Sequence, residues 1–79
     1  MELTGNEKQV AWAETIRAEM VMSLEKDIEN NFDQHTEKKA MSVLDWVKAQ
    51  KDAEWWIENR DIECIEDAYY LWIEAGMEN

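Results

Sequence analysis

The chain contains no proline, and its two glycines, Gly5 and Gly76, lie close to its ends. These two residue types interrupt helices most strongly, so an interior without them favours helices joined by short polar turns. The alternation of apolar and polar residues that marks a half-buried strand is absent. We therefore predict an all-α fold in a single domain, residues 1–79. We expect a compact bundle of three or four helices, at about residues 5–30, 36–51, 52–60 and 62–75.

The first predicted helix has the clearest pattern. Thr4 followed by Glu7 matches a capping box, in which the two side chains pair with free amides of the first turn. Apolar residues then recur every three or four positions, which predicts a buried stripe made of Val10, Ala13, Ile16, Met20, Leu24 and Ile28. Trp12 lies off this stripe, at its edge or exposed. Phe32 follows the helix and is expected to fold back onto the core.

The second predicted helix begins near Thr36. Its buried stripe, widened by two flanking residues, contains Ala40, Val43, Leu44, Val47, Met41 and Trp46. Beyond it, either a third, shorter helix begins at Asp52 or the second helix continues to about Asn59. In both cases one face carries Ala53, Trp56, Ile57 and Arg60. Successive helical residues are about 100° apart, so Trp55 and Trp56 cannot share a face. We expect Trp56 in the core and Trp55 at its edge, with a contact surface or dimer interface as the alternative for Trp55.

The last predicted helix begins after Asp61, a residue type favoured at the N-cap. Its buried stripe, flanked by Ile73, consists of Ile62, Ile65, Ala68, Tyr69 and Trp72. Gly76 is placed to end the helix, because glycine adopts the left-handed conformation that a helix C-terminus often needs.

The size of the chain makes folding demanding. A domain of 79 residues buries a smaller fraction of its surface than a larger one does. Cys64 is the only cysteine, so no disulfide forms within one chain, which fits a reducing compartment. Five tryptophans supply much of the apolar area instead. The polar N-terminus and the lack of a long apolar run predict a soluble, cytoplasmic protein.

The charge balance excludes some partners. The chain has 19 acidic and 8 basic residues, a net charge of −11. Nucleic acids and anionic membranes are recognised with Lys and Arg, so neither is an expected direct partner. The excess is uneven, since residues 1–51 have a net charge of −3 and residues 52–79 a net charge of −8. A basic surface on a nucleic-acid-binding protein fits this charge, and ordinary solvation of an acidic protein is the alternative.

The acidic residues follow helical spacing. In helices, residues three and four apart share a face, and like charges there oppose helix stability by a few tenths of a kcal/mol per pair. One row contains Glu54, Glu58 and Asp61. The other contains Glu63, Glu66, Asp67 and Glu74. We predict that these carboxylates bind a partner protein, with Trp55 or Tyr70 as the apolar anchor.

No catalytic or cofactor signature is present. His35 is the only histidine, and the loop spacing of an EF-hand is missing, so we expect no metal site. A Cys64–His35 nucleophile pair lacks any orienting motif. No glycine-rich phosphate loop occurs. We therefore predict a protein that is not an enzyme and needs no cofactor.

Two segments resemble small proteins of bacteria, their phages and mobile elements. The opening carries their Gly-x-x-Lys-Gln-x-x-Trp-Ala-Glu-x-Ile-Arg pattern at Gly5, Lys8, Gln9, Trp12, Ala13, Glu14, Ile16 and Arg17. A later Trp-Trp-Ile-x-x-Arg pattern matches Trp55, Trp56, Ile57 and Arg60. The two segments cover about a third of the chain. The resemblance implies a prokaryotic or phage-derived cytosolic protein, and it assigns no functional residue.

Size, charge and this context favour one function by analogy. Small acidic phage proteins of the anti-CRISPR and anti-restriction type occupy a basic nucleic-acid channel of a defence complex. The first hypothesis is such an inhibitor. The second is a non-enzymatic assembly module that forms a homodimer through Trp12 or Trp55. The third is a regulator that recruits its partner through Lys8, Gln9 and Trp12.

Overall fold

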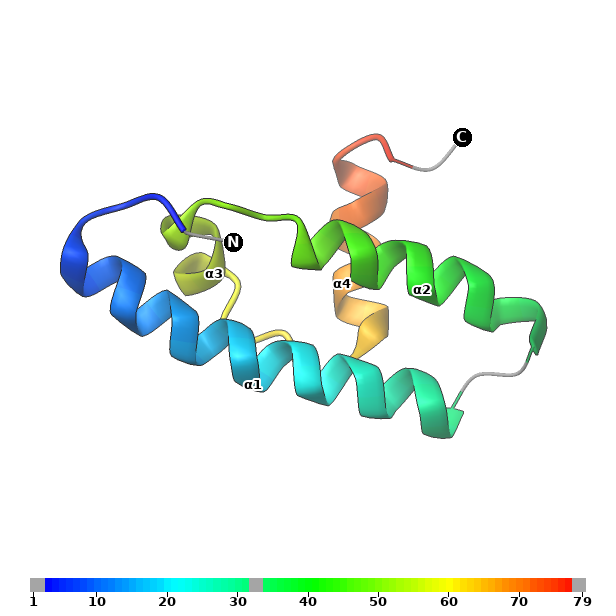
Figure 1. Cartoon of the computed structure of the whole chain (residues 1–79). Helices are drawn as coiled ribbons and strands as arrows, with labels where there is room; N and C mark the ends of the chain where they lie inside the picture. The colour runs from blue at the N-terminus through cyan, green and yellow to red at the C-terminus, as the bar shows by residue number, and fades with distance from the viewer. Residues whose placement is uncertain (1–2, 32–33, 78–79) are drawn as a thin grey trace.

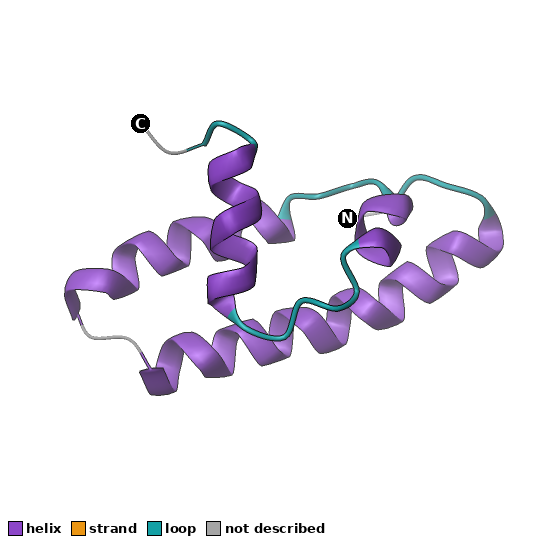
Figure 2. Ribbon diagram, turned by 180° about the vertical axis from the view of Figure 1, so that it is seen from behind, coloured by secondary structure: helices purple, strands orange, loops and turns teal. Residues whose placement is uncertain are grey.

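Four α-helices make up the described part of the chain, residues 3–31 and 34–77 of a computed structural model (Figure 1). The helices are α1 (Glu7–Asn31), α2 (Gln34–Lys48), α3 (Ala53–Glu58) and α4 (Ile65–Glu74). Loops join α2 to α3 and α3 to α4, and the described residues form no strand beyond one isolated bridge between Thr4 and Asp52 (Figure 2). The predicted all-α fold is confirmed. Of the two possibilities for residues 52–59, a separate third helix is correct.

The helices are arranged as a hairpin with two additions. α1 and α2 run antiparallel, and α4 begins beside α1 and crosses α2 (Figures 1 and 2). The short helix α3 packs on α1, close to the N-terminal segment. The backbones of α3 and α4 do not approach each other closely. The α1–α2 hairpin thus provides the main support of both acidic helices.

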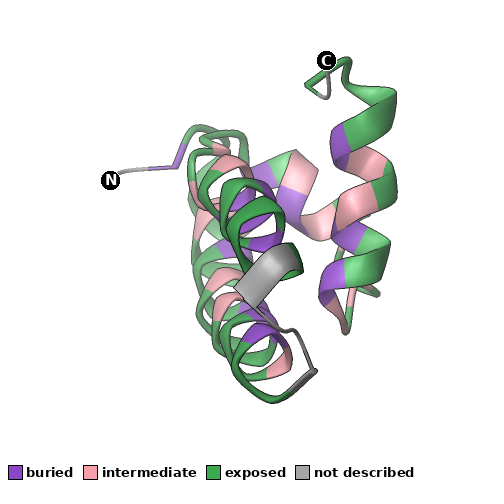
Figure 3. Ribbon diagram, turned by 90° about the vertical axis from the view of Figure 1, so that its right-hand side faces the viewer, coloured by how far each residue is buried: buried purple, intermediate pink, exposed green. Residues whose placement is uncertain are grey.

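The core is one cluster of apolar side chains between these helices. Most of the stripe predicted on α1 is buried, with Val10 only partly covered, and the α2 residues Ala40, Val43, Leu44 and Val47 are buried as expected. α4 buries Ile65, Ala68 and Trp72 and turns its exposed positions outward (Figure 3). Met41 does not widen the α2 stripe, because it is 41% exposed. Phe32, predicted to fold onto the core, lies outside the described residues.

The start of α1 differs from the prediction. The capping box is formed by Asn6 and Gln9: the Gln9 amide donates to Asn6 Oδ1 at 2.9 Å, and the Asn6 amide donates to Gln9 Oε1 at 3.2 Å. Thr4 has a different role. Its amide donates to the Lys51 carbonyl at 2.7 Å, and its carbonyl accepts from the Ala53 amide at 2.8 Å. This backbone pairing ties the N-terminal segment to the start of α3, so Thr4 is not the cap.

Trp56 fixes α3 on the core. Its side chain is fully buried, and its indole N–H donates to the Gln50 carbonyl at 3.0 Å. The hydrogen bond satisfies the one polar atom of the buried ring. Asp52 begins the helix as its N-cap, accepting from the Glu54 amide at 3.0 Å. Trp55 points to the edge of the core and is half-buried, as predicted.

The start of α4 also differs from the prediction. Asp61 is not the N-cap, because residues 59–64 form a turn and α4 begins at Ile65. Cys64 is the N-cap residue and makes no side-chain capping bond. The carboxylate of Asp27 on α1 instead accepts from the Ile65 amide at 2.9 Å. A remote carboxylate thus takes the place of a local cap and complements the positive end of the helix dipole.

The end of α4 confirms the prediction for Gly76. Gly76 has φ of 76°, and its amide donates to the Ile73 carbonyl at 2.9 Å. The Met77 amide donates to the Trp72 carbonyl at 3.2 Å. These two bonds define a Schellman motif, which requires the left-handed conformation that glycine adopts without strain.

The Asp27 contact gives a stability test. We expect Asp27→Ala to lower the free energy of unfolding by about 1 kcal/mol, because it leaves the first amide of α4 without its carboxylate acceptor. Asp27→Asn keeps an oxygen acceptor and should lose less. Urea denaturation measures both, with the exposed Glu29→Ala on the same helix as control. A loss for Asp27→Ala no larger than that for Glu29→Ala would show that the contact does not hold α4.

Candidate protein-binding surface

The residues predicted to bind a partner lie on α3, on α4 and in the turn between them. Glu54, Trp55 and Glu58 belong to α3. Asp61 and Glu63 lie in the turn. Glu66, Asp67, Tyr70 and Glu74 belong to α4. All of these side chains are exposed except Trp55, which is half-buried.

The carboxylates do not form one continuous helical row. α3 ends at Glu58, so only Glu54 and Glu58 keep the predicted spacing on that helix, and Asp61 leaves it. Glu63 likewise precedes α4. The surface therefore consists of two acidic helix faces joined by an acidic turn, and we call it the acidic surface. The backbones of its two helices do not approach each other closely, and each packs on the α1–α2 hairpin.

The pKa of Glu54 reflects the repulsion between carboxylates in this surface. The neighbouring Glu58 raises the pKa of Glu54, first by charge repulsion and second by a side-chain hydrogen bond, and Asp52 adds further repulsion. The direction of this shift shows that carboxylates, and not a cation, dominate the surroundings of Glu54. A cationic group brought next to Glu54 and Glu58 would relieve this repulsion.

The only basic residue of 52–79 is engaged elsewhere. The guanidinium of Arg60 lies over the ring of Trp12, 5.4 Å from its centroid. Arg60 also donates through Nη1 to the Ile57 carbonyl at 2.6 Å. These contacts fasten the turn to α1 and hold the single cation of this segment at an aromatic ring. The sequence places Arg60 on a face with Trp56, but the structure leaves it exposed.

The two predicted aromatic anchors differ in availability. Trp55 packs edge-to-face between two other indoles, with centroid distances of 5.8 Å to Trp46 and 5.0 Å to Trp56. Such contacts stabilise the edge of the core and occupy much of its ring. Tyr70 is 56% exposed, and its hydroxyl donates to Glu66 at 3.4 Å. Tyr70 is therefore the better placed anchor.

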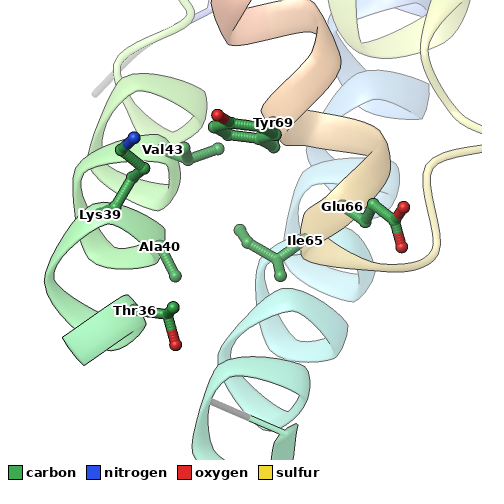
Figure 4. A pocket seen from close by; sticks show the side chains of 7 residues that line it. All are labelled: Thr36, Lys39, Ala40, Val43, Ile65, Glu66 and Tyr69. Carbon is green, nitrogen blue, oxygen red and sulfur yellow. The ribbon is translucent and has the colours of Figure 1, made fainter. Parts of the chain in front are cut away.

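A hollow of about 330 Å³ lies between α2 and α4 (Figure 4). Ala40, Val43 and Ile65 give it apolar walls. The ammonium group of Lys39 lies 5.8 Å from the ring centroid of Tyr69 at its rim. Figure 4 shows the Glu66 carboxylate directed away from the hollow.

Among residues 3–31 and 34–77, no group of three or more His, Cys, Asp or Glu side chains is arranged to hold a metal ion. Cys64 is a half-buried free thiol at the start of α4. The side chain of His35 lies outside the described part of the structure, as does the Cys64–His35 pair considered from the sequence.

Comparison with known proteins identifies no relative. No protein-family model matches the chain, and no significant match is found among curated proteins or solved structures. Within the described residues, none of the helices has the length and apolar character needed to cross a membrane. The charge, exposure and contacts of the acidic surface are therefore the observations that bear on function.

The raised pKa of Glu54 predicts a pH-dependent effect. A carboxyl whose pKa is raised on folding favours the folded state at low pH, and this contribution is lost as the pH rises through the folded pKa. Above that pKa the repulsion opposes folding. We expect Glu54→Gln to be more stable than the parent protein at pH 7, with the difference disappearing below the ordinary value of 4.5. Thermal unfolding between pH 3 and 8 measures it.

The matched control is Glu25→Gln on the exposed side of α1, which removes the same charge from a different helix. An equal gain for both variants would attribute the effect to net charge. No gain for Glu54→Gln at pH 7 would contradict the repulsion inferred for Glu54 and Glu58.

Proposed function

We propose that this protein is an acidic inhibitor that binds a nucleic-acid-binding defence complex of the anti-CRISPR or anti-restriction target type. It occupies a basic surface that otherwise holds nucleic acid. The observation that carries the proposal is the acidic surface itself. Every carboxylate predicted to bind the partner is exposed, within a segment of net charge −8 whose one cation is engaged with Trp12.

Electrostatics supports this mode of action. Glu54 and Glu58 are separated by one helical turn, which places their Cβ atoms about 5–6 Å apart. A channel lined with Lys and Arg attracts such an array of negative charge as it attracts phosphates. The carboxylates would exchange mutual repulsion for attraction on binding. Charge of this kind mainly contributes fast association and choice of partner, so apolar contacts must supply much of the affinity.

A homodimer is the second candidate, and one observation favours it. Trp12 is 50% exposed on α1, and an interface would cover it. The net charge of −11 opposes this candidate, because two copies repel each other. Trp55, the other residue considered for a dimer, is already packed between Trp46 and Trp56. Recruitment through Lys8, Gln9 and Trp12 shares this α1 surface.

The proposal predicts which charges matter for capture of a target. The tagged protein is incubated with lysate of a bacterium that has active CRISPR and restriction systems, at low and at high salt. The test variant carries Glu54→Gln, Glu58→Gln, Glu66→Gln and Asp67→Asn. The control variant removes four exposed charges of α1 with Glu14→Gln, Glu19→Gln, Glu25→Gln and Glu29→Gln.

We expect the parent and the control variant to capture a nucleic-acid-binding complex that added nucleic acid displaces and high salt weakens. The test variant should bind about tenfold more weakly or worse, since exposed ion pairs contribute roughly 0.2–1 kcal/mol each. Equal loss in both variants would reduce the effect to net charge. A stable dimer with no captured basic protein, dissociated by Trp12→Ala, would support the second candidate instead.

A further inference from the structure

α4 carries apolar side chains on two sides. Its inner side is buried through Ile65, Ala68 and Trp72. On the outside, Tyr70, Ile73 and Met77 remain 56%, 39% and 47% exposed. A helix that only completes a core needs one apolar stripe and is polar elsewhere. The outward apolar residues of α4 are thus unexplained by folding.

These outward residues lie together. Tyr70 and Ile73 are three positions apart, and Glu66 and Glu74 lie one turn before and after Tyr70, so the four share a face. The Schellman motif ends the helix directly after them and turns the chain at Met77. We call Glu66, Tyr70, Ile73 and Glu74 the α4 outer face. Figure 3 shows α4 at one side of the molecule, where this face is open to solvent.

Tyr70 is held in place on this face. Its hydroxyl donates to Glu66, one turn earlier, at 3.4 Å. The ring centroid of Tyr70 lies 6.0 Å from that of Tyr69. The Tyr69 ring centroid lies in turn 5.8 Å from that of the buried Trp72. A large aromatic side chain that is already oriented loses little entropy on binding, which is the property of an interface anchor.

We propose that the α4 outer face docks, as a helix, into an apolar groove with a basic rim on the partner protein. This inference rests on the proposed function and deepens it by naming the docking helix and the shape of the site it fits. Tyr70 and Ile73 provide anchors at the i, i+3 spacing of helix-in-groove recognition, and Met77 follows the end of the helix. Glu66 and Glu74 flank the anchors and meet the basic rim.

Charge decides between a partner and a second copy. A two-fold dimer through this face would place Glu66 and Glu74 of both copies in one interface without a basic residue on that face. The segment 52–79 would bring a net charge of −8 from each copy. A groove rimmed with Lys and Arg gives complementary charge instead. The occupant is therefore a basic protein surface.

The test uses two synthetic peptides of equal length and charge. One is an amphipathic Leu–Lys helix, which offers an apolar stripe with basic edges. The other replaces every Leu with Ser and offers the charge alone. Binding to the isotopically labelled full chain is followed by amide chemical shifts. The variants are Tyr70→Ala with Ile73→Ala, and Met22→Ala on α1 as the control, since Met22 is similarly exposed at 59%.

We expect the Leu–Lys peptide to bind about tenfold more tightly than the Ser–Lys peptide, with shifts centred on residues 66–77. The Tyr70→Ala/Ile73→Ala variant should lose this preference, whereas Met22→Ala should keep it. Urea unfolding of both variants checks that the helices are intact. Three results would overturn the inference: no preference for Leu–Lys, shifts centred on α1 or on the α2–α4 hollow, or an equal loss in Met22→Ala.

The experiments distinguish a failure of the α4 docking from a failure of the proposed inhibitor function. Capture of a nucleic-acid-binding complex that needs the carboxylates, but tolerates Tyr70→Ala/Ile73→Ala, would support the inhibitor and overturn the α4 docking. Binding of the Leu–Lys peptide at the α4 outer face without capture of any such complex would support the docking and contradict the inhibitor.

Discussion

The buried indole of Trp56 is the contact on which the rest of the acidic surface depends. The short helix α3 has six residues, far fewer than an isolated helix needs in water. Complete burial of Trp56, with its N–H bonded to the Gln50 carbonyl, holds α3 against α1. Because Trp56 faces inward, Trp55 lies at the core edge and Glu54 and Glu58 face solvent. One side chain thus orients both the aromatic cluster and the carboxylates.

Two long-range contacts complete this arrangement. The pairing of Thr4 with residues 51–53 fastens the chain just before α3, and Asp27 fastens the start of α4. The first amide of each acidic helix, that of Ala53 in α3 and that of Ile65 in α4, therefore donates to a residue from the first half of the chain. The exposed side chains of α3 and α4 are carboxylates, Tyr70 and Ile73. The repulsion that raises the pKa of Glu54 indicates that this surface does not add to the stability of the fold.

The sequence predicted the features that local chemistry determines. The α1 stripe follows from helical spacing, and Gly76 ends α4 because only that conformation closes the Schellman motif. The predicted caps at Thr4 and Asp61 were wrong because α1 is capped by Asn6 and Gln9 and α4 begins only at Ile65, starts that depend on long-range pairing. Thr4 bonds 47 residues away, and Ile65 is capped from 38 residues away. The acidic row likewise broke where the chain turns after Glu58 to reach α4, and the outward exposure of Ile73 and Met77 needed the packing of α4 to be known.

The most direct test of this account is the solvent exchange of the five tryptophan indole protons, followed by nuclear magnetic resonance. Each tryptophan gives one indole signal, so Trp56 and Trp12 are compared in one sample. We predict that the Trp56 proton exchanges far more slowly than the half-exposed Trp12 proton, because the first is buried and hydrogen-bonded. Equal and fast exchange of the two would contradict the account, since α3 would then lack the anchor that orients the acidic surface.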